Sequence, residues 1–326
     1  MELVILSAED VRRALPMKQA IEAMKSAFSQ LSANQADMPL RTRLQTDKGL
    51  LLLMPAFLRQ SREFAFKMVS IWGDNPRQGL PAVIALATVI DPDTGQPRAI
   101  INGEALTALR TGAGGGLATE LLARPDAQVV TVFGAGVQAR AQLEAACAVR
   151  QITEVRLVGR TPGAVETFAK EVSGWPHAPQ VSLAASRNEA VEGADIIIAA
   201  TTSTTPVFDG RYLAPGTHIT GVGSYAPHMQ EVDETTVQRS KIVVDSLQAC
   251  LAEAGDLIMP LDKNIITKLD IHGELGAIVN GEIPGRESPE EITFFKSVGV
   301  AVQDAAAANA IFRAAQAQGL GAVVKL

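Results

Sequence analysis

The chain has few of the residues that most often carry metal or nucleophilic chemistry. Two cysteines and four histidines occur among 326 residues. Cys147 and Cys250 lie in apolar helical patterns without metal-ligand spacing, so we expect both to be buried thiols. The histidines form no i, i+4 pair, and the sequence contains no Gly-x-Ser-x-Gly nucleophile elbow. We therefore expect neither a metal site nor a serine nucleophile of the nucleophile-elbow type.

Positive charge and long apolar runs are scarce as well. Lys and Arg number 29 against 35 Asp and Glu, which leaves a net charge of −6, and no basic run counters it. Nucleic acids and anionic membranes require basic patches, so we expect neither as a partner. Every apolar run is shorter than the roughly 18 residues that a spanning helix needs. Residues 1–4 lack the basic start of a secretion signal, so we expect a cytoplasmic protein.

What the chain does contain is a glycine motif within residues 128–139. A short apolar run leads into Gly134-x-Gly136-x-x-Ala139, and a helical pattern begins near Gln138. This strand–turn–helix context predicts a dinucleotide-binding turn rather than an ordinary strand–helix connection. Gly134 permits the tight turn, Gly136 lets the backbone approach a pyrophosphate, and Ala139 keeps the helix close to the strand.

Strands and helices alternate after residue 127, which predicts a doubly wound parallel sheet of the Rossmann type. The expected strands are residues 129–133, 154–158, 181–184, 196–200, 218–221 and 242–245. Residues 294–326 have an alanine-rich helical pattern, and we expect the last helix to fold back on the N-terminal part of the chain. The fold class is therefore α/β.

The first hundred residues have a different pattern, that of an α+β unit with an antiparallel-leaning sheet. Ser7 begins a capping box, and residues 17–31 have one apolar helical face. The expected strands are residues 40–44, 49–55, 64–70, 83–90 and 99–101.

Residues 104–124 then have a helical pattern that contains four glycines between Gly112 and Gly116. Because glycine costs about 1 kcal/mol at each position inside a helix, such a cluster needs a reason. Either another backbone or a cofactor lies very close, or the segment breaks into two helices. The pattern does not distinguish the two.

Arg160 and Thr161 stand where a Rossmann unit usually has an acidic residue for the adenosine ribose. The sequence there is Val158-Gly159-Arg160-Thr161-Pro162, without a carboxylate. Arg160 can face a 2′-phosphate and Thr161 can donate a hydrogen bond to it, which favours NADP over NAD.

Lys67 lies in the middle of an apolar strand and is costly to bury unless it is paired or its pKa has shifted. It is a candidate proton donor or carboxylate partner, or else it reaches water from a sheet edge. Arg41, Arg43 and Arg110 flank the same expected sheet. One or two of them can clamp a substrate carboxylate, although an arginine taken singly more often forms a surface ion pair.

Taken together, several segments resemble the ornithine cyclodeaminase/mu-crystallin family over essentially the whole chain. The Leu-Thr-Ala-Leu-Arg-Thr and Lys-Ser-Val-Gly segments, placed in this order around the glycine motif, are the specific ones. The segments are Phe64-Ala65-Phe66-Lys67 and residues 91–95, 106–111, 134–139, 221–224, 273–276 and 295–299.

The resemblance implies a homodimer with two domains. Residues 1–118 together with 304–326 would form the substrate-binding and dimerisation domain, and residues 119–303 the Rossmann NAD(P)-binding domain. By matching position, Arg41, Lys67 and Arg110 hold the substrate carboxylate and polarise the reacting carbon and nitrogen.

The resemblance also implies cofactor contacts, which add to those inferred above for Gly134, Gly136, Arg160 and Thr161. Ala135, Val137 and Gln138 would meet the pyrophosphate, with Thr111 beside it. Residues near the nicotinamide would be Thr201, Val222 and the stretch from Ser297 to Gly299.

The chain departs from the family's ornithine cyclodeaminases and archaeal alanine dehydrogenases just after Gly221-Val222-Gly223. Where those enzymes carry an aspartate, this chain has Ser224 and Tyr225. No carboxylate at this place accepts the protons of an amine substrate. Members with a small or hydroxyl residue here resemble ketimine reductases, which act on Δ1-pyrroline-2-carboxylate or Δ1-piperideine-2-carboxylate.

The sequence therefore predicts an NADP-preferring oxidoreductase that reduces a cyclic imino acid to L-proline or L-pipecolate, with NADPH, or else NADH, as cofactor. Arg41 and Arg110 fix the carboxylate, Lys67 bonds the carboxylate or relays the proton, and Ser224 orients a water at the imine nitrogen. The alternatives are an amino acid dehydrogenase, an ornithine cyclodeaminase, and a non-catalytic NADP-binding protein. A binding protein has no need of the carboxylate clamp.

Overall fold

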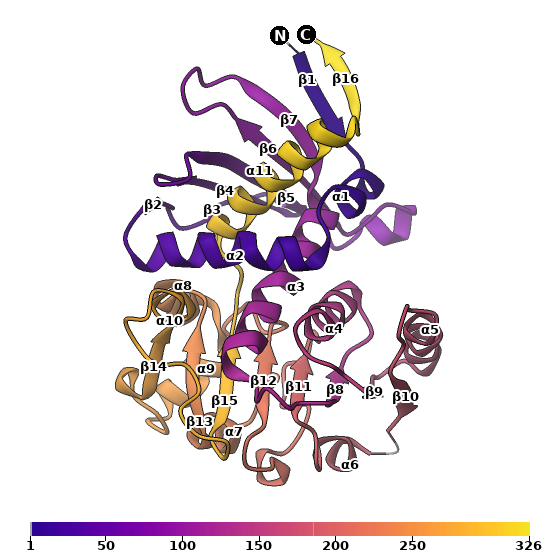
Figure 1. The fold of residues 1–326 in the computed structure, drawn as a ribbon, viewed down its shortest axis with the longest axis vertical. Helices are drawn as coiled ribbons and strands as arrows, with labels where there is room; N and C mark the ends of the chain where they lie inside the picture. The colour runs from indigo at the N-terminus through magenta and orange to yellow at the C-terminus, as the bar shows by residue number, and fades with distance from the viewer. Residues whose placement is uncertain (1, 185) are drawn as a thin grey trace. The chain divides into compact units, whose positions relative to one another are not determined.

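The computed structural model describes residues 2–184 and 186–326 (Figure 1). The chain forms two compact units. The first unit joins the chain up to Arg110 with Val300–Leu326, and the second unit is Thr111–Gly299. The divisions fall inside helix α3 (Gly103–Leu122) and directly before α11 (Ala301–Gln318), a few residues before the predicted boundaries.

The first unit is built on a mixed eight-stranded sheet. Its strands are β1 (Glu2–Leu6), β2 (Ala36–Asp37), β3 (Thr42–Gln45), β4 (Leu50–Leu58), β5 (Glu63–Ile71), β6 (Val83–Ile90), β7 (Pro97–Asn102) and β16 (Ala322–Lys325). They follow the order β16-β1-β7-β6-β5-β4-β2, with β3 also paired to β4. All pairs are antiparallel except β1 with β7, so the antiparallel-leaning sheet is confirmed.

The helices of the first unit cover one face of this sheet. They are α1 (Ala8–Ala14), α2 (Met17–Ser32) and α11, with the short turn η1 (Asn75–Gln78) between strands. Figure 1 shows α11 crossing the strands, and it packs on β4, β5 and β6. Met54 and Lys67, which are paired in register, are buried on this face. On the other face Leu53 and Leu86 are exposed at 37% and 41%.

One prediction was made near each end of the chain, a capping box at the start and a helix at the end. Ser7 and Asp10 form the predicted capping box of α1, so that prediction is confirmed. Residues 294–326 are not helical throughout, because β15 (Ile292–Lys296) reaches into this range and β16 ends it. Strand β15 is buried at every position, and a short apolar run of this kind cannot be told from a buried helix by periodicity.

The second unit is a doubly wound sheet of eight parallel strands, as predicted. The order is β10-β9-β8-β11-β12-β15-β13-β14. The strands are β8 (Val129–Phe133), β9 (Glu154–Val158), β10 (Gln180–Leu183), β11 (Ile196–Ala199), β12 (His218–Gly221), β13 (Ser240–Val244), β14 (Ile271–Glu274) and β15. All six predicted strands are present to within two residues at each end, while β14 and β15 were not predicted.

Helices connect these strands. They are α4 (Val137–Val149), α5 (Pro162–Ser173), α6 (Arg187–Val191), α7 (Glu234–Arg239), α8 (Leu247–Glu253), α9 (Gly255–Asp262) and α10 (Leu275–Val279), with the turns η2 (Gly210–Tyr212) and η3 (Lys268–Asp270). Alternating strands and helices bury both faces of a parallel sheet, which is why β8, β11 and β15 are mostly apolar and almost fully buried.

Two glycines of α3 lie against α4. A Cβ added to Gly112 would meet the carbonyl oxygen of Ala141 at 2.6 Å, and one added to Gly115 would overlap the side chain of Gln142. The Gln142 side chain in turn donates a hydrogen bond to the carbonyl oxygen of Thr111 at 2.7 Å. Helix α3 is continuous, so the break between two helices is wrong and the close approach of another backbone is confirmed.

The two cysteines differ in their burial. Cys250 is buried, as expected, whereas Cys147 is only partly buried. Within residues 2–184 and 186–326, none of the helices has the length and apolar content that crossing a membrane requires.

Candidate active site

The turn between β8 and α4 has the geometry that the glycine motif predicts. Gly134 has a φ of 111°, and a Cβ there would run into the carbonyl oxygen of Ala200. Gly136 is the N-cap of α4, and no atom lies within 4 Å of a Cβ added to it. Ala139 is fully buried in the core between α4 and the sheet. The first turn of α4 thus presents uncapped backbone amides to open space, an arrangement that fits a pyrophosphate.

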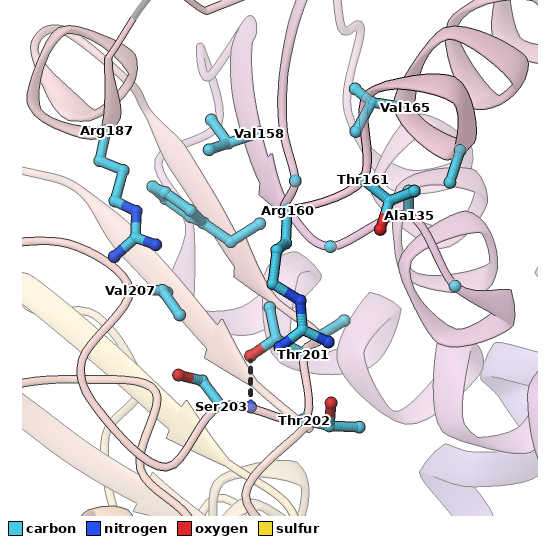
Figure 2. A pocket seen from close by; sticks show the side chains of 16 residues that line it. Ala135, Val158, Arg160, Thr161, Val165, Arg187, Thr201, Thr202, Ser203 and Val207 are labelled. Carbon is cyan, nitrogen blue, oxygen red and sulfur yellow. Dashed lines mark hydrogen bonds between the residues drawn. The ribbon is translucent and has the colours of Figure 1, made fainter.

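A cavity of about 370 Å³ opens at the carboxyl ends of β8, β9 and β11 (Figure 2). Ligands of open parallel sheets bind at this edge. Six of the residues predicted to contact the cofactor line it, namely Gly134, Ala135, Gly136, Arg160, Thr161 and Thr201.

Two guanidinium groups enter this cavity from different elements. Arg160 follows β9 and Arg187 begins α6, and Figure 2 shows both side chains directed into the cavity. None of the described residues that line it carries a carboxylate. A ribose 2′-hydroxyl is usually held by an acidic residue, whereas a 2′-phosphate requires cations. The sequence interpretation missed Arg187, whose only signal is its position shortly after an expected strand.

One buried carboxylate holds the loops that follow β11 and β12. Glu231 accepts hydrogen bonds from the backbone amide of Thr201 at 2.6 Å, from its hydroxyl at 2.8 Å, and from the amide of Gly223 at 2.6 Å. The amide of Glu231 donates to Asp256, which pairs with Lys296 at 2.9 Å. Burial raises the pKa of Glu231, and the Lys296 ammonium opposes that rise. This network joins the ends of β11, β12 and β15.

Three other predicted cofactor residues lie buried at the same edge of the sheet. Val222 directly follows β12, while Ser297 and Gly299 follow β15. The Ser297 hydroxyl and the Gly299 amide both donate to Asp245, at 2.7 and 2.8 Å. Their predicted place beside a nicotinamide is compatible with this edge and stays a prediction.

Thr111, Val137 and Gln138 do not line the cavity. Thr111 is 9% exposed, and Val137, at the start of α4, is 65% exposed. The Gln138 Oε1 atom is buried and has no hydrogen-bond partner within the described part of the chain. The contacts predicted for these three residues with a cofactor stay predictions.

The first unit contains a second polar site, on the helix-covered face of β5. The Lys67 ammonium donates to Asp304 Oδ1 at 2.8 Å and to the hydroxyl of Thr107 at 3.3 Å. The Arg110 Nε, from α3, donates to the same Asp304 oxygen at 3.0 Å. Lys67 is only 1% exposed, so the alternative in which it reaches water from a sheet edge is wrong.

This site carries more positive than negative charge. Burial and the charges of Arg110 and Arg41 together lower the pKa of Lys67 to about 8, against the opposing effect of Asp304. Lys67 and Arg110 thus place two cations on one carboxylate, a balance that favours binding of a small anion. Arg41 directly precedes β3, and Arg43 lies within β3 and is exposed.

Ser224 is fully buried. Its hydroxyl donates to the carbonyl oxygen of Met229 at 2.8 Å and accepts from the amide of Asp256 at 3.3 Å. These bonds give the side chain a structural role in fixing the loop after β12 against α9. The catalytic role predicted for Ser224 stays a prediction, and neither contact requires it.

The sequence interpretation also missed Asp304 and Gln303 in the first turn of α11. Gln303 Oε1 accepts from Arg110 Nη1 at 3.1 Å. Asp304 is the only acidic residue of an alanine-rich helix. A lone carboxylate among buried alanines is rarely left unpaired, and that was the available signal. Within residues 2–184 and 186–326, no cluster of three His, Cys, Asp or Glu side chains is arranged to hold a metal ion.

Comparison with known proteins places these features in a family context. A model of the ornithine cyclodeaminase/mu-crystallin family matches residues 1–319. A Δ1-pyrroline-2-carboxylate reductase from Bacillus cereus is 37% identical over 322 residues and is matched over 98% of both chains.

Two solved structures are similar over nearly the whole chain. The Δ1-pyrroline-2-carboxylate reductase of Thermococcus litoralis, in complex with NADH and L-proline, is 41% identical with a TM-score of 0.93, covering 98% of this chain and 99% of that one. An archaeal alanine dehydrogenase dimer with bound NAD is 34% identical with a TM-score of 0.93, covering all of both chains.

Proposed function

The chain belongs to the ornithine cyclodeaminase/mu-crystallin family, as its motifs predict, and we propose that it is a nicotinamide-dependent reductase of cyclic ketimino acids. It reduces Δ1-pyrroline-2-carboxylate to L-proline, or Δ1-piperideine-2-carboxylate to L-pipecolate, or both. The observation that carries this proposal is the buried pair of Lys67 and Arg110, whose surplus positive charge suits a small carboxylate. The reductase relatives support the cyclic imine as the group that is reduced.

The residues of the first unit bind and orient the acid. Arg110 and Arg41 hold the carboxylate, which fixes the position of the adjacent carbon C2. The Lys67 ammonium, protonated below a pKa of about 8, bonds the carboxylate or gives a proton to the imine nitrogen. The bound cofactor supplies the hydride that C2 receives.

A second chemistry, the oxidation of an open-chain amino acid, has support from the alanine dehydrogenase relative. That reaction, like cyclodeamination, releases protons from an amine. The positions where the family's dehydrogenases carry an aspartate hold Ser224 and Tyr225 here, and the Ser224 hydroxyl is engaged within its loop. Reduction of an imine is therefore favoured over both.

We also propose that NADPH is preferred over NADH. The support is the cavity itself, which receives Arg160 and Arg187 and is lined by no described carboxylate. A 2′-phosphate matches this charge, whereas the 2′-hydroxyl of NADH gains little from it. The T. litoralis relative contains NADH, so the proposed preference for NADPH is supported by the cavity of this chain and not by that relative.

A homodimer through the first unit is the third part of the proposal. In the rows where β3, β4, β5 and β6 pair, the face opposite α11 carries aliphatic side chains. Leu44, Ile84 and Leu86 on this face are exposed at 58%, 40% and 41% in the single chain. A contiguous apolar sheet face of this kind is typical of a subunit interface, and the alanine dehydrogenase relative is a dimer.

The test is NADPH oxidation with each cyclic imine, for the wild-type protein and for Lys67→Ala. We expect kcat/KM to fall in the variant by a factor on the order of 10² to 10⁴, since both a carboxylate contact and a proton donor are removed. Lys18→Ala, an exposed lysine on α2, is the control and should match the wild type. Intact protein that binds NADPH but reduces neither imine would overturn the proposal and direct the search to open-chain oxo acids with ammonia.

A further inference from the structure

Asp304 is the point at which three elements of the first unit meet. It lies in the first turn of α11, and its side chain is 2% exposed. Its Oδ1 atom accepts from Lys67 on β5 at 2.8 Å and from Arg110 on α3 at 3.0 Å. A single oxygen of Asp304 therefore positions both Lys67 and Arg110, the two side chains that are proposed to bind the carboxylate of the substrate.

The charges around Lys67 show what Asp304 contributes. The charged groups acting on the Lys67 ammonium are Arg110 from α3, Arg41 from the segment before β3, and Asp304 from α11. Burial and the two arginines favour loss of the lysine proton, and Asp304 opposes it through its charge and its hydrogen bond. Without this carboxylate two buried cations would face each other, an arrangement that buried sites rarely sustain.

Arg110 is held by further hydrogen bonds besides the one to Asp304. Its Nη1 donates to Gln303 Oε1 at 3.1 Å, and the Gln303 amide group donates back to the carbonyl oxygen of Arg110 at 3.3 Å. The amide of Val300 also donates to Gln303 Oε1, at 3.0 Å. Two successive residues of α11 thus set the direction of one guanidinium group before any ligand is bound, which is preorganisation.

We propose that Asp304 is the positioning residue of the carboxylate site, holding the Lys67 ammonium and the Arg110 guanidinium side by side, both charged, so that they bind one anion together. It acts through these two residues, and it supplies the buried negative charge that their joint burial requires. The inference rests on the proposed function for its substrate, but the arrangement itself can be measured in the protein without substrate.

The first measurement is the pKa of Lys67 by carbon-13 NMR of lysine ε-carbons, with the resonance assigned by its loss in Lys67→Met. We expect a value near 8 in the wild type and a lower value in Asp304→Asn. Asparagine keeps the size and the acceptor oxygen but removes the charge. The control is Glu63→Gln, because Glu63 on β5 pairs with Arg313 on α11 at 2.7 Å and so joins the same two elements away from Lys67.

The second measurement is kcat/KM for the cyclic imine as a function of pH. Since a protonated Lys67 binds the carboxylate, kcat/KM should fall above pH 8 in the wild type and at lower pH in Asp304→Asn. The KM of the variant should rise on the order of tenfold to a hundredfold, the value of one charge-assisted contact. Glu63→Gln should leave both unchanged.

A purely structural Asp304 gives a different result. Asp304→Asn would then melt at a lower temperature, as Glu63→Gln would, with an unchanged Lys67 pKa and an unchanged alkaline limb, and the proposal would be overturned. If the wild type reduces neither imine, the proposed function fails by itself. The NMR comparison still decides whether Asp304 controls the charge of Lys67.

Discussion

At the scale of single residues, this chain places its charges where two different anions are expected. Lys67 and Arg110 form one positive site around Asp304 in the first unit. Arg160 and Arg187 form another at the cavity of the second unit. The first site is buried, where uncompensated positive charge is costly, whereas the two arginines of the second site are exposed and attract an anion by their charge alone.

The cofactor proposal makes a prediction at this scale. Arg160→Ala should weaken NADPH binding by about tenfold to a hundredfold while changing NADH binding little, since only NADPH carries a 2′-phosphate. Dissociation constants for both cofactors can be measured by fluorescence titration. Arg211→Ala, an exposed arginine of the same unit, is the matched control. An equal loss for both cofactors, or for neither, would contradict the assignment of Arg160.

At the scale of elements, the cofactor edge of the second sheet depends on loops held by buried carboxylates. Glu231 joins the loop after β11 to the loop after β12, and Asp245 gathers the residues after β15. Loops that satisfy their amides on a buried carboxylate keep one conformation without bound ligand. A cofactor-binding edge built in this way is formed in advance.

Glu231→Gln tests this arrangement. One of the two carboxylate oxygens would become an NH2 group, which cannot accept the hydrogen bond from the Thr201 or Gly223 amide that it faces, so that loop should loosen and NADPH should bind at least about tenfold more weakly. The matched control is Asp195→Asn, because Asp195 also accepts from two backbone amides, those of Gln128 and Val129, but at the opposite end of β8. Both variants should lose thermal stability. Only Glu231→Gln should lose cofactor affinity, and equal affinities would show that the loops bind independently of this carboxylate.

At the scale of the whole molecule, the apolar face of the first sheet is the feature that a single chain leaves open. Its aliphatic side chains belong to four adjacent strands, β3 to β6, so one partner surface can cover them together. Burying such a face adds roughly 25 cal/mol for each Å² removed from water. Association with a second copy is the proposed means of covering it.

Leu86→Glu should convert the dimer to a monomer, because it places a charge on this face at a position that is 41% exposed in the single chain. Light scattering coupled to gel filtration measures the change directly, with twice the chain mass expected for the wild type. Leu269→Glu changes a leucine that is 95% exposed in the second unit and should remain dimeric. A wild-type protein that runs as a monomer would refute the proposed interface.

Local patterns in the sequence were enough to determine the doubly wound sheet, the turn around Gly134 and the family. Each depends on neighbours along the chain: the period of apolar residues, the φ that a glycine permits, and short motifs in order. The placement of Lys67 within an apolar strand left two alternatives open, a buried cation or one that reaches water from a sheet edge, and the structure has it buried. Arg160 indicated the position of the cavity, since it lies two residues after a predicted strand.

Only the tertiary structure decided which groups meet. Asp304 bonds Lys67 across 237 positions of sequence, and Glu231 bonds Thr201 across 30, and no local pattern indicates the partner of either carboxylate. It also decided that the polar face of β5 is closed by α11 while the other face stays open. The physical reason is that a charge can be buried only against its partner, and that partner is chosen by how distant segments pack.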